Sequence, residues 1–310
     1  MARKKIKEKT PAEVGKQDAG VKINVMKTAK IALICISALL LVYDVFYMLP
    51  DANPNAIDRL KTIAAFILMS YGIGYTILSF LKKPEDPFEK HFMTLGVGLS
   101  VIPILTLALN TIGVPLNSII LLLVSMVYPA YSLLLKRREI PIDKNNLNKL
   151  FEGKNVLIML VVVLLASLYL FVLLEGALNL PYLEDDDSWD HAVGAKYVSV
   201  MQTYSLPKGV PVTHYLEPYP PTYDGLMGIL HQYNTSLQWT LKFFNAFLIG
   251  LSIIMAYYFI RLFTGSEEIA LGGAFILTVV PCYLSHFIWA HTLGQVLFYP
   301  TLYAVEKAGK

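Results

Sequence analysis

The sequence predicts an all-α, polytopic integral membrane protein with seven or eight transmembrane helices and one long external loop. Of its 310 residues, 55% are hydrophobic and only 16% are charged. The apolar residues are clustered, because residues 155–174, NVLIMLVVVLLASLYLFVLL, contain no charged side chain. As a helix, a run of about 20 apolar residues crosses the hydrocarbon core of a bilayer. A soluble protein can bury one such helix, but a soluble chain of this length does not need seven of them.

Each predicted span is an apolar run of similar length. The runs cover residues 31–49, 62–81, 92–113, 116–135, 155–174, 243–260 and 269–290, with a shorter one at 292–305. The first run is longer than the apolar region of a signal peptide and no small-residue cleavage site follows it, so we expect it to stay in the mature protein. We expect Pro103, Pro129 and Pro281 to kink their helices. Cys35 and Cys282 fall at different depths of different spans, which argues against a disulfide.

The distribution of Lys and Arg predicts the orientation in the cell membrane. Nine basic residues lie in residues 1–30, three in KKPEDPFEKH and six in KRREIPIDKNNLNKLFEGK, so we assign these segments to the cytoplasm. Residues 176–236 contain two Lys and seven acidic residues, which places this loop outside. The net charge of +3 is therefore mostly a topology signal and gives no reason to expect a nucleic-acid partner.

These features divide the chain into four regions. A basic cytoplasmic N-terminus (1–30) is followed by a four-helix transmembrane region (31–135), a basic cytoplasmic loop (136–154) and a module (155–310) that contains the external loop 176–236. In the four-helix region, Asp44 is an ionisable residue inside a span, which makes it a candidate proton or ion site or a solvated aspartate near the interface. No internal repeat of the kind found in many transporters is present.

The external loop contains a predicted amphipathic helix. Apolar residues recur at spacings of three and four: Trp189, Val193, Tyr197, Val200, Met201 and Tyr204. The opposite face carries Asp190, Lys196, Ser199 and Gln202. Asp187 or Ser188 is expected to cap its start. Such a helix could lie flat at the membrane surface or pack on the rest of the loop.

The run LEDDDSWDH holds more acidic residues than a helix cap requires. Asp187 and His191 are four residues apart, as are Asp186 and Asp190. Two carboxylates and an imidazole could therefore face one volume above the membrane, a donor set that suits Mg²⁺ or Mn²⁺. The spacing makes this cluster a candidate metal site. A solvated acidic patch at the helix N-terminus is the alternative.

A second motif, HYLEPYPPTYDGLMGILHQ, covers residues 214–232. Its prolines fix an extended turn. The turn would display Tyr219, Tyr223 and Asp224, which we predict as substrate-binding residues. His214, His231 and His291 are each interpreted as structural hydrogen-bonding residues.

Together, DDDSWDHAVGAKY and YPPTYDGLMGIL carry a family resemblance. A transmembrane helix, the acidic motif, an amphipathic helix, the proline motif and a returning span resemble the first external loop of the GT-C superfamily of membrane glycosyltransferases. This superfamily includes protein O-mannosyltransferases, aminoarabinose transferases and oligosaccharyltransferases. The similarity covers about residues 155–305 and consists of residue types in a fixed order.

The resemblance implies inverting transfer of a sugar from a polyprenyl phosphate to an external acceptor, a protein or a lipid. In that reaction one carboxylate deprotonates the acceptor hydroxyl, and a cation or basic group neutralises the departing phosphate. By position, the catalytic base is Asp186 or Asp187. Asp190 and His191 would then be metal or phosphate-side residues.

Two other functions stay open at this point. GT-C cores usually contain more spans than the three or four present after residue 155, so the chain resembles an N-terminal or truncated part that could bind or assemble without catalysis. A transporter is the third possibility, on the basis of Asp44 and the proline-containing spans.

Overall fold

The chain is all-helical wherever its structure is described. The computed structural model describes residues 54–81, 86–135, 153–209, 212–281, 283 and 285–309, and these residues form nine helices and no strand. The helices are α2 (Ala56–Leu78), α3 (Pro87–Thr111), α4 (Ser118–Leu135), α6 (Gly153–Leu178), α7 (Asp186–Met201), α8 (Thr222–His231), α9 (Leu237–Thr264), α10 (Glu267–Val279) and α11 (Ala290–Ala308). Outside the described residues lie the predicted span 31–49 with Asp44 and Cys35, the basic segments 1–30 and 136–152, and Cys282.

Four of these helices are long and apolar enough to cross a membrane. They are Ala56–Leu78, Phe88–Thr111, Val156–Leu178 and Leu237–Thr264. The predicted spans 62–81, 92–113, 155–174 and 243–260 fall on them. The predicted span 116–135 corresponds to α4, whose clearly apolar part, Ser118–Ser132, is shorter. The result is compatible with a membrane protein, with fewer candidate spans in the described residues than the seven or eight predicted for the whole chain.

The predicted span 269–290 is not one helix. Helix α10 ends at Val279, and Val280 already has an extended conformation (φ −75°, ψ 123°). The cause is Pro281, because a proline lacks the N–H that would continue the helix and disfavours the helical conformation of the residue before it. Pro103 and Pro129, by contrast, lie inside α3 and α4. Helix α11 begins only at Ala290, and its 19 residues include the predicted short span 292–305.

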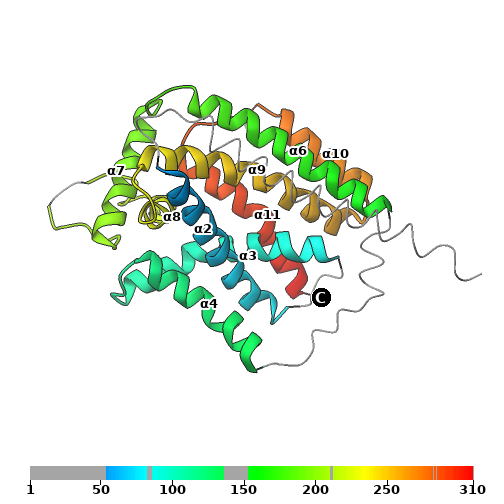
Figure 1. Cartoon of the computed structure of the whole chain (residues 1–310), viewed down its shortest axis with the longest axis horizontal. Helices are drawn as coiled ribbons and strands as arrows, with labels where there is room; N and C mark the ends of the chain where they lie inside the picture. The colour runs from blue at the N-terminus through cyan, green and yellow to red at the C-terminus, as the bar shows by residue number, and fades with distance from the viewer. Residues whose placement is uncertain are drawn as a thin grey trace, which may run out of the picture. The chain divides into compact units, whose positions relative to one another are not determined.

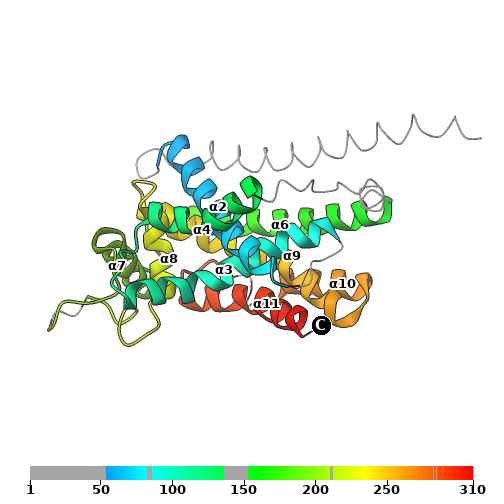
Figure 2. The same ribbon diagram turned by 90° about the horizontal axis from the view of Figure 1, so that it is seen from below.

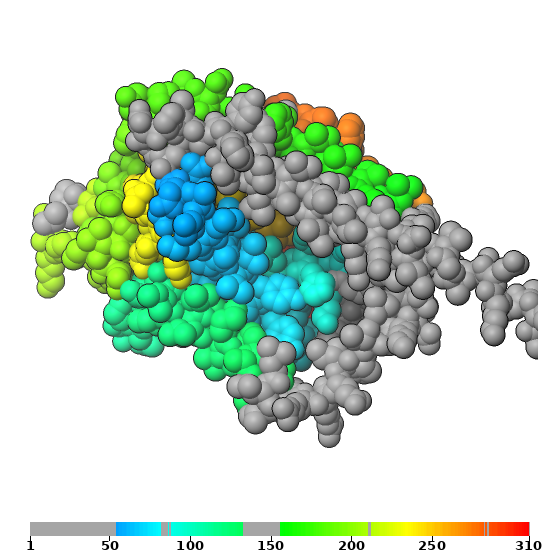
Figure 3. Space-filling view, viewed as in Figure 1, coloured from blue at the N-terminus to red at the C-terminus, as the bar shows by residue number. Residues whose placement is uncertain are grey.

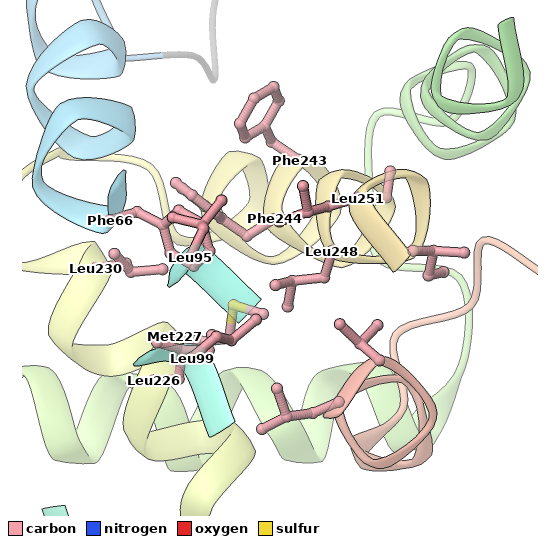
Figure 4. Packing of buried hydrophobic residues seen from close by; sticks show 14 of the residues in the cluster. Phe66, Leu95, Leu99, Leu226, Met227, Leu230, Phe243, Phe244, Leu248 and Leu251 are labelled. Carbon is pink, nitrogen blue, oxygen red and sulfur yellow. The ribbon is translucent and has the colours of Figure 1, made fainter. Parts of the chain in front are cut away.

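Helix α9 is the centre of the bundle. It packs against α6, α10 and α11 and also touches α3, α7 and α8. Within its apolar window 83% of the residues are buried, whereas the figure for α6 is 28%. Figure 4 shows the core beside α9, where Phe66 of α2, Leu99 of α3 and Leu226 of α8 meet Phe244 and Leu248. The outer face of α6 exposes large apolar side chains at Leu157, Leu164, Leu168 and Val172, as expected for a surface that faces lipid.

Helices α7 and α8 lie together at one end of the bundle, which we call the loop end (Figures 1 and 2). The hydroxyl of Tyr204, just after α7, donates to Thr106 Oγ1 of α3 over 2.9 Å. Thr203 donates to Asn110 Oδ1 over 2.7 Å. Gln232, just after α8, accepts from the Ser118 N–H over 2.8 Å. The segment after α6 is therefore tied to α3 and α4, which precede the predicted boundary at 136–154.

Charged residues of α3, α9 and α11 meet at the opposite end, which we call the ion-pair end. Arg261 donates to Asp86 over 2.9 Å and forms a second ion pair with Glu89. Lys307 lies 3.4 Å from Glu89, and the Tyr303 hydroxyl donates to the same carboxylate. The bundle thus brings charged side chains of α9 and α11 to the segment KKPEDPFEKH, which the Lys and Arg distribution assigns to the cytoplasm.

Candidate functional site

Helix α7 begins within the acidic run LEDDDSWDH, which follows candidate span α6. Asp185 is its N-cap, and Asp185 Oδ1 accepts from the Ser188 N–H over 2.7 Å. The prediction that Asp187 or Ser188 is the cap was wrong. Three successive aspartates can all cap, and in the structure the first is used, so that Asp186 and Asp187 fall in the first turn. There the positive end of the helix dipole stabilises both carboxylates.

The buried face of α7 is made of small residues that pack against α8. It consists of Ser188, His191, Ala192, Gly194, Ala195 and Val198. A Cβ atom on Gly194 would lie 1.9 Å from Asp224 Oδ2, so the close approach of the two helices requires glycine there. Of the predicted apolar face, Trp189, Val193, Val200 and Met201 are exposed, and Tyr204 is buried against α3.

His191 and Asp224 form a buried pair between α7 and α8. Their Nδ1 and Oδ1 atoms are 2.6 Å apart, and each residue is 1% exposed. His191 Nε2 accepts from the N–H of Ala290, the first residue of α11, over 3.2 Å. The ring hydrogen is therefore on Nδ1 and is donated to Asp224. This pair ties α7, α8 and the start of α11 together.

His191 does not fit the predicted role of metal ligand, because both of its ring nitrogens are already engaged. Asp190 turns instead toward His214, with Oδ2 and Nδ1 3.3 Å apart. Across the described ranges, no group of three or more His, Cys, Asp or Glu residues has an arrangement that could hold a metal ion. Helical spacing placed His191 near the carboxylates of its own helix, but its partner is a carboxylate 33 residues further along the chain.

The predicted substrate-binding residues lie in different environments. Tyr223 and Asp224 are 2% and 1% exposed, and the Tyr223 hydroxyl donates to Asn245 Oδ1 of α9 over 3.2 Å. Tyr219 is 57% exposed. Of the predicted catalytic residues, Asp186 is exposed and makes no side-chain hydrogen bond or ion pair within the described residues. Asp187 is exposed too, and its Oδ1 accepts from the Tyr215 hydroxyl over 2.7 Å.

Next to these carboxylates, three rings form what we call the aromatic ledge: His214, Tyr215 and Tyr219. The centroids of His214 and Tyr215 are 4.0 Å apart, and those of Tyr215 and Tyr219 are 5.6 Å apart. On its inner side, Tyr215 stacks on His191 at 3.8 Å. Partial desolvation and the hydrogen bond to Asp187 raise the pKa of Tyr215, so its hydroxyl stays protonated and donates. Of these three residues, only Tyr219 is predicted from the sequence as part of a site.

A second group of polar side chains joins the loop after α6 to α9 and to the segment just before α11. His286 Nε2 and Glu184 Oε1 are 3.0 Å apart. Lys242 of α9, 5% exposed, donates to the Leu180 carbonyl over 2.6 Å. Asn245 donates to the carbonyls of His286 and Phe287. This group could not be predicted from the sequence, because its members lie on segments far apart in the chain and no regular spacing relates them.

Comparisons with known proteins give no relative. No family model, no curated protein and no solved structure matches the chain. The assignment of a function therefore depends on the residues of the loop end themselves.

Asp224 makes the stability of the loop end depend on pH. Burial raises the pKa of Asp224 to about 6, although the hydrogen bond and charge of His191 oppose the shift. A carboxyl group whose pKa is higher in the folded state stabilises the fold at low pH and loses that contribution as the pH rises from about 4 to 6. We expect the free energy of unfolding to fall by about 2 kcal/mol more between pH 4.5 and 6.5 in the wild type than in Asp224→Asn. Denaturation of the purified protein at both pH values measures this difference. Equal pH dependence of the two proteins would contradict the assignment.

Proposed function

We propose that this protein is a membrane glycosyltransferase that moves a sugar from a polyprenyl-phosphate donor to an external acceptor. The observation that carries the proposal is the position of two exposed carboxylates, Asp186 and Asp187, in the first turn of α7. A loop of only seven residues, 179–185, separates α7 from the candidate span α6. The headgroup of a lipid-linked sugar lies at the membrane surface. A helix that begins so soon after a span lies at the same depth.

The orientation and the remaining spans belong to the same proposal. The loop end is external and the ion-pair end is cytoplasmic, in agreement with the Lys and Arg distribution. In this proposal the protein crosses the cell membrane several times. Its further spans lie at 31–49, at 116–135 and in the part of the chain after α9. The exposed apolar side chains of α6 support contact with lipid.

The proposed reaction assigns a role to each carboxylate. Asp186, which has no internal partner in the described residues, accepts the proton of the acceptor hydroxyl. The acceptor oxygen then bonds to the anomeric carbon as the bond from that carbon to the phosphate oxygen breaks, and the polyprenyl phosphate leaves with the electron pair. Asp187 is held by Tyr215 beside this position and accepts a hydrogen bond from a sugar hydroxyl. Mg²⁺ or Mn²⁺ stays a prediction from the sequence, and no step is assigned to it.

The test is transfer of labelled sugar from a polyprenyl-phosphate donor in membranes that contain the protein. We expect Asp186→Asn to lower the rate about 100-fold or more, because the general base is lost. Asp187→Asn should have a smaller effect. Asp58→Asn is the matched control, since Asp58 lies in the first turn of α2 and is already paired with Lys61 over 3.3 Å. Wild-type rates in both Asp186→Asn and Asp187→Asn would remove the catalytic assignment.

Binding without catalysis is the second candidate function. It is favoured by the internal contacts of the predicted site residues: His191 bonds to Asp224 and to α11, and Tyr223 bonds to α9. This alternative expects the wild-type protein to retain the donor lipid and to give no transfer, with equal retention in Asp186→Asn.

A further inference from the structure

The aromatic ledge is exposed although its rings are held in a fixed arrangement. Tyr219 is 57% exposed, and the His214 side chain is 47% exposed. Single exposed aromatic residues are ordinary on protein surfaces. Here three rings lie in mutual contact, and the carboxylates of Asp187 and Asp190 lie beside them at the rim of the ledge. Tyr204 and Tyr223, by comparison, are buried.

The backbone around the ledge is fixed before any ligand binds. The Tyr219 N–H donates to the His214 carbonyl over 3.2 Å, which closes the loop that carries all three rings. Leu216, within that loop, is 5% exposed and anchors it in the core. Pro218, Pro220 and Pro221 restrict the chain further, because the pyrrolidine ring fixes φ. A ligand would therefore lose little affinity to ordering of the loop.

The carboxylates at the rim have capacity for a further partner. Asp187 uses Oδ1 to accept from Tyr215, and Asp190 uses Oδ2 toward His214. Each carboxylate has a second oxygen, and neither Asp187 Oδ2 nor Asp190 Oδ1 bonds to another side chain in the described part of the protein. An ionised carboxylate only accepts hydrogen bonds, so the matching ligand group is a hydroxyl or another donor.

From these features we infer that the aromatic ledge, with Asp187 and Asp190, is a binding subsite for a hexopyranose ring, the sugar of the donor. A pyranose presents a face of C–H groups, which pack on the negative face of an aromatic ring, and an edge of hydroxyls, which donate to carboxylates. The inference rests on the proposed function, because Asp187 is adjacent in the chain to the proposed base Asp186. It adds His214, Tyr215 and Asp190 to the residues that contact the substrate.

Binding can be measured separately from transfer. The full chain in lipid nanodiscs is mixed with methyl α-D-mannopyranoside or methyl β-D-glucopyranoside, and saturation-transfer NMR reports which ligand protons contact the protein. We expect saturation of the ring C–H protons for at least one pyranoside, and less for sorbitol, an open-chain polyol with no apolar ring face. Tyr219→Ala and His214→Ala should each bind about three- to tenfold more weakly. Tyr182→Ala is the matched control, because Tyr182 is 67% exposed in the same external segment and lies outside the ledge.

Several outcomes decide the inference. Displacement of the pyranoside by a short-chain polyprenyl-phosphate hexose supports the donor assignment, and absence of displacement overturns it. No pyranoside saturation above empty nanodiscs, or equal binding by wild type, Tyr219→Ala and His214→Ala, would reject the subsite. Pyranoside binding at the ledge together with no sugar transfer would reject the proposed function and leave the subsite standing.

Discussion

Replacing Gly98 with leucine is expected to separate α2 from α3 and to cost about 3 kcal/mol of stability or more. A Cβ atom on Gly98 would lie 1.6 Å from the Ser70 carbonyl oxygen, and one on Gly74 would lie 1.7 Å from the Thr94 carbonyl oxygen. Backbone atoms are the obstacle in both cases, so no rotation of a side chain can relieve the clash. Close helix contact through small residues is how membrane helices gain packing energy. Thermal denaturation of the purified protein in detergent measures the loss.

Gly294→Ala is the control for this experiment. Gly294 lies inside α11, and a Cβ atom there meets no other atom within 4 Å. Alanine also favours the helix by about 1 kcal/mol relative to glycine. We expect this variant to be as stable as the wild type or slightly more stable. A Gly98→Leu protein that melts at the same temperature as Gly294→Ala would contradict the close α2–α3 packing.

Arg261→Met is the second change with a large expected effect, about 3 kcal/mol of destabilisation. The Arg261 side chain is 21% exposed and neutralises Asp86 and Glu89, which are 30% and 11% exposed. It also lies over the Tyr258 ring at 4.9 Å. Its removal leaves two carboxylates close together, with only Lys307 near Glu89. Chemical denaturation of the purified variant gives the magnitude.

The triple variant Arg261→Met, Asp86→Asn, Glu89→Gln separates charge from packing. Asparagine at position 86 can still cap α3, a role that Asp86 performs by accepting from the Phe88 N–H over 2.9 Å. We expect the triple variant to recover a large part of the lost stability, since no unpaired charge remains. Stability no better than that of Arg261→Met alone would mean that the ion pairs contribute little.

Apolar run length predicted much of the helical framework. Helices α2, α3, α6 and α9 lie where the sequence indicates membrane spans, because about 20 apolar residues favour a helix wherever they are buried or face lipid. The error at 269–290 has a local cause. Apolar composition continues through Pro281, but the backbone cannot continue as a helix there. The prediction of a kink at this proline was wrong, because α10 ends at Val279, before it.

The candidate site was predictable only where its signal is local. The helix after the acidic run follows from the spacing of apolar residues along one segment, but Trp189 and Val193 of its predicted apolar face are exposed, and a different face is buried. The partners of His191 and Glu184 do not, because Asp224 and His286 lie 33 and 102 residues away from them. Helical spacing therefore suggested a metal-binding cluster within α7, whereas packing against α8 and α11 turned the imidazole inward.

The most direct test of the proposed activity is the stoichiometry of the reaction in purified proteoliposomes. The donor carries one label in the hexose and another in the polyprenyl chain, and both products are counted over time. Figure 3 shows α7 and the loop after it at the surface, where such a donor could reach them. We predict equal amounts of transferred sugar and polyprenyl monophosphate, and about 100-fold less of both with Asp186→Asn. Product formation no greater than in empty vesicles, or equal in wild type and Asp186→Asn, would contradict the assignment of glycosyl transfer to this site.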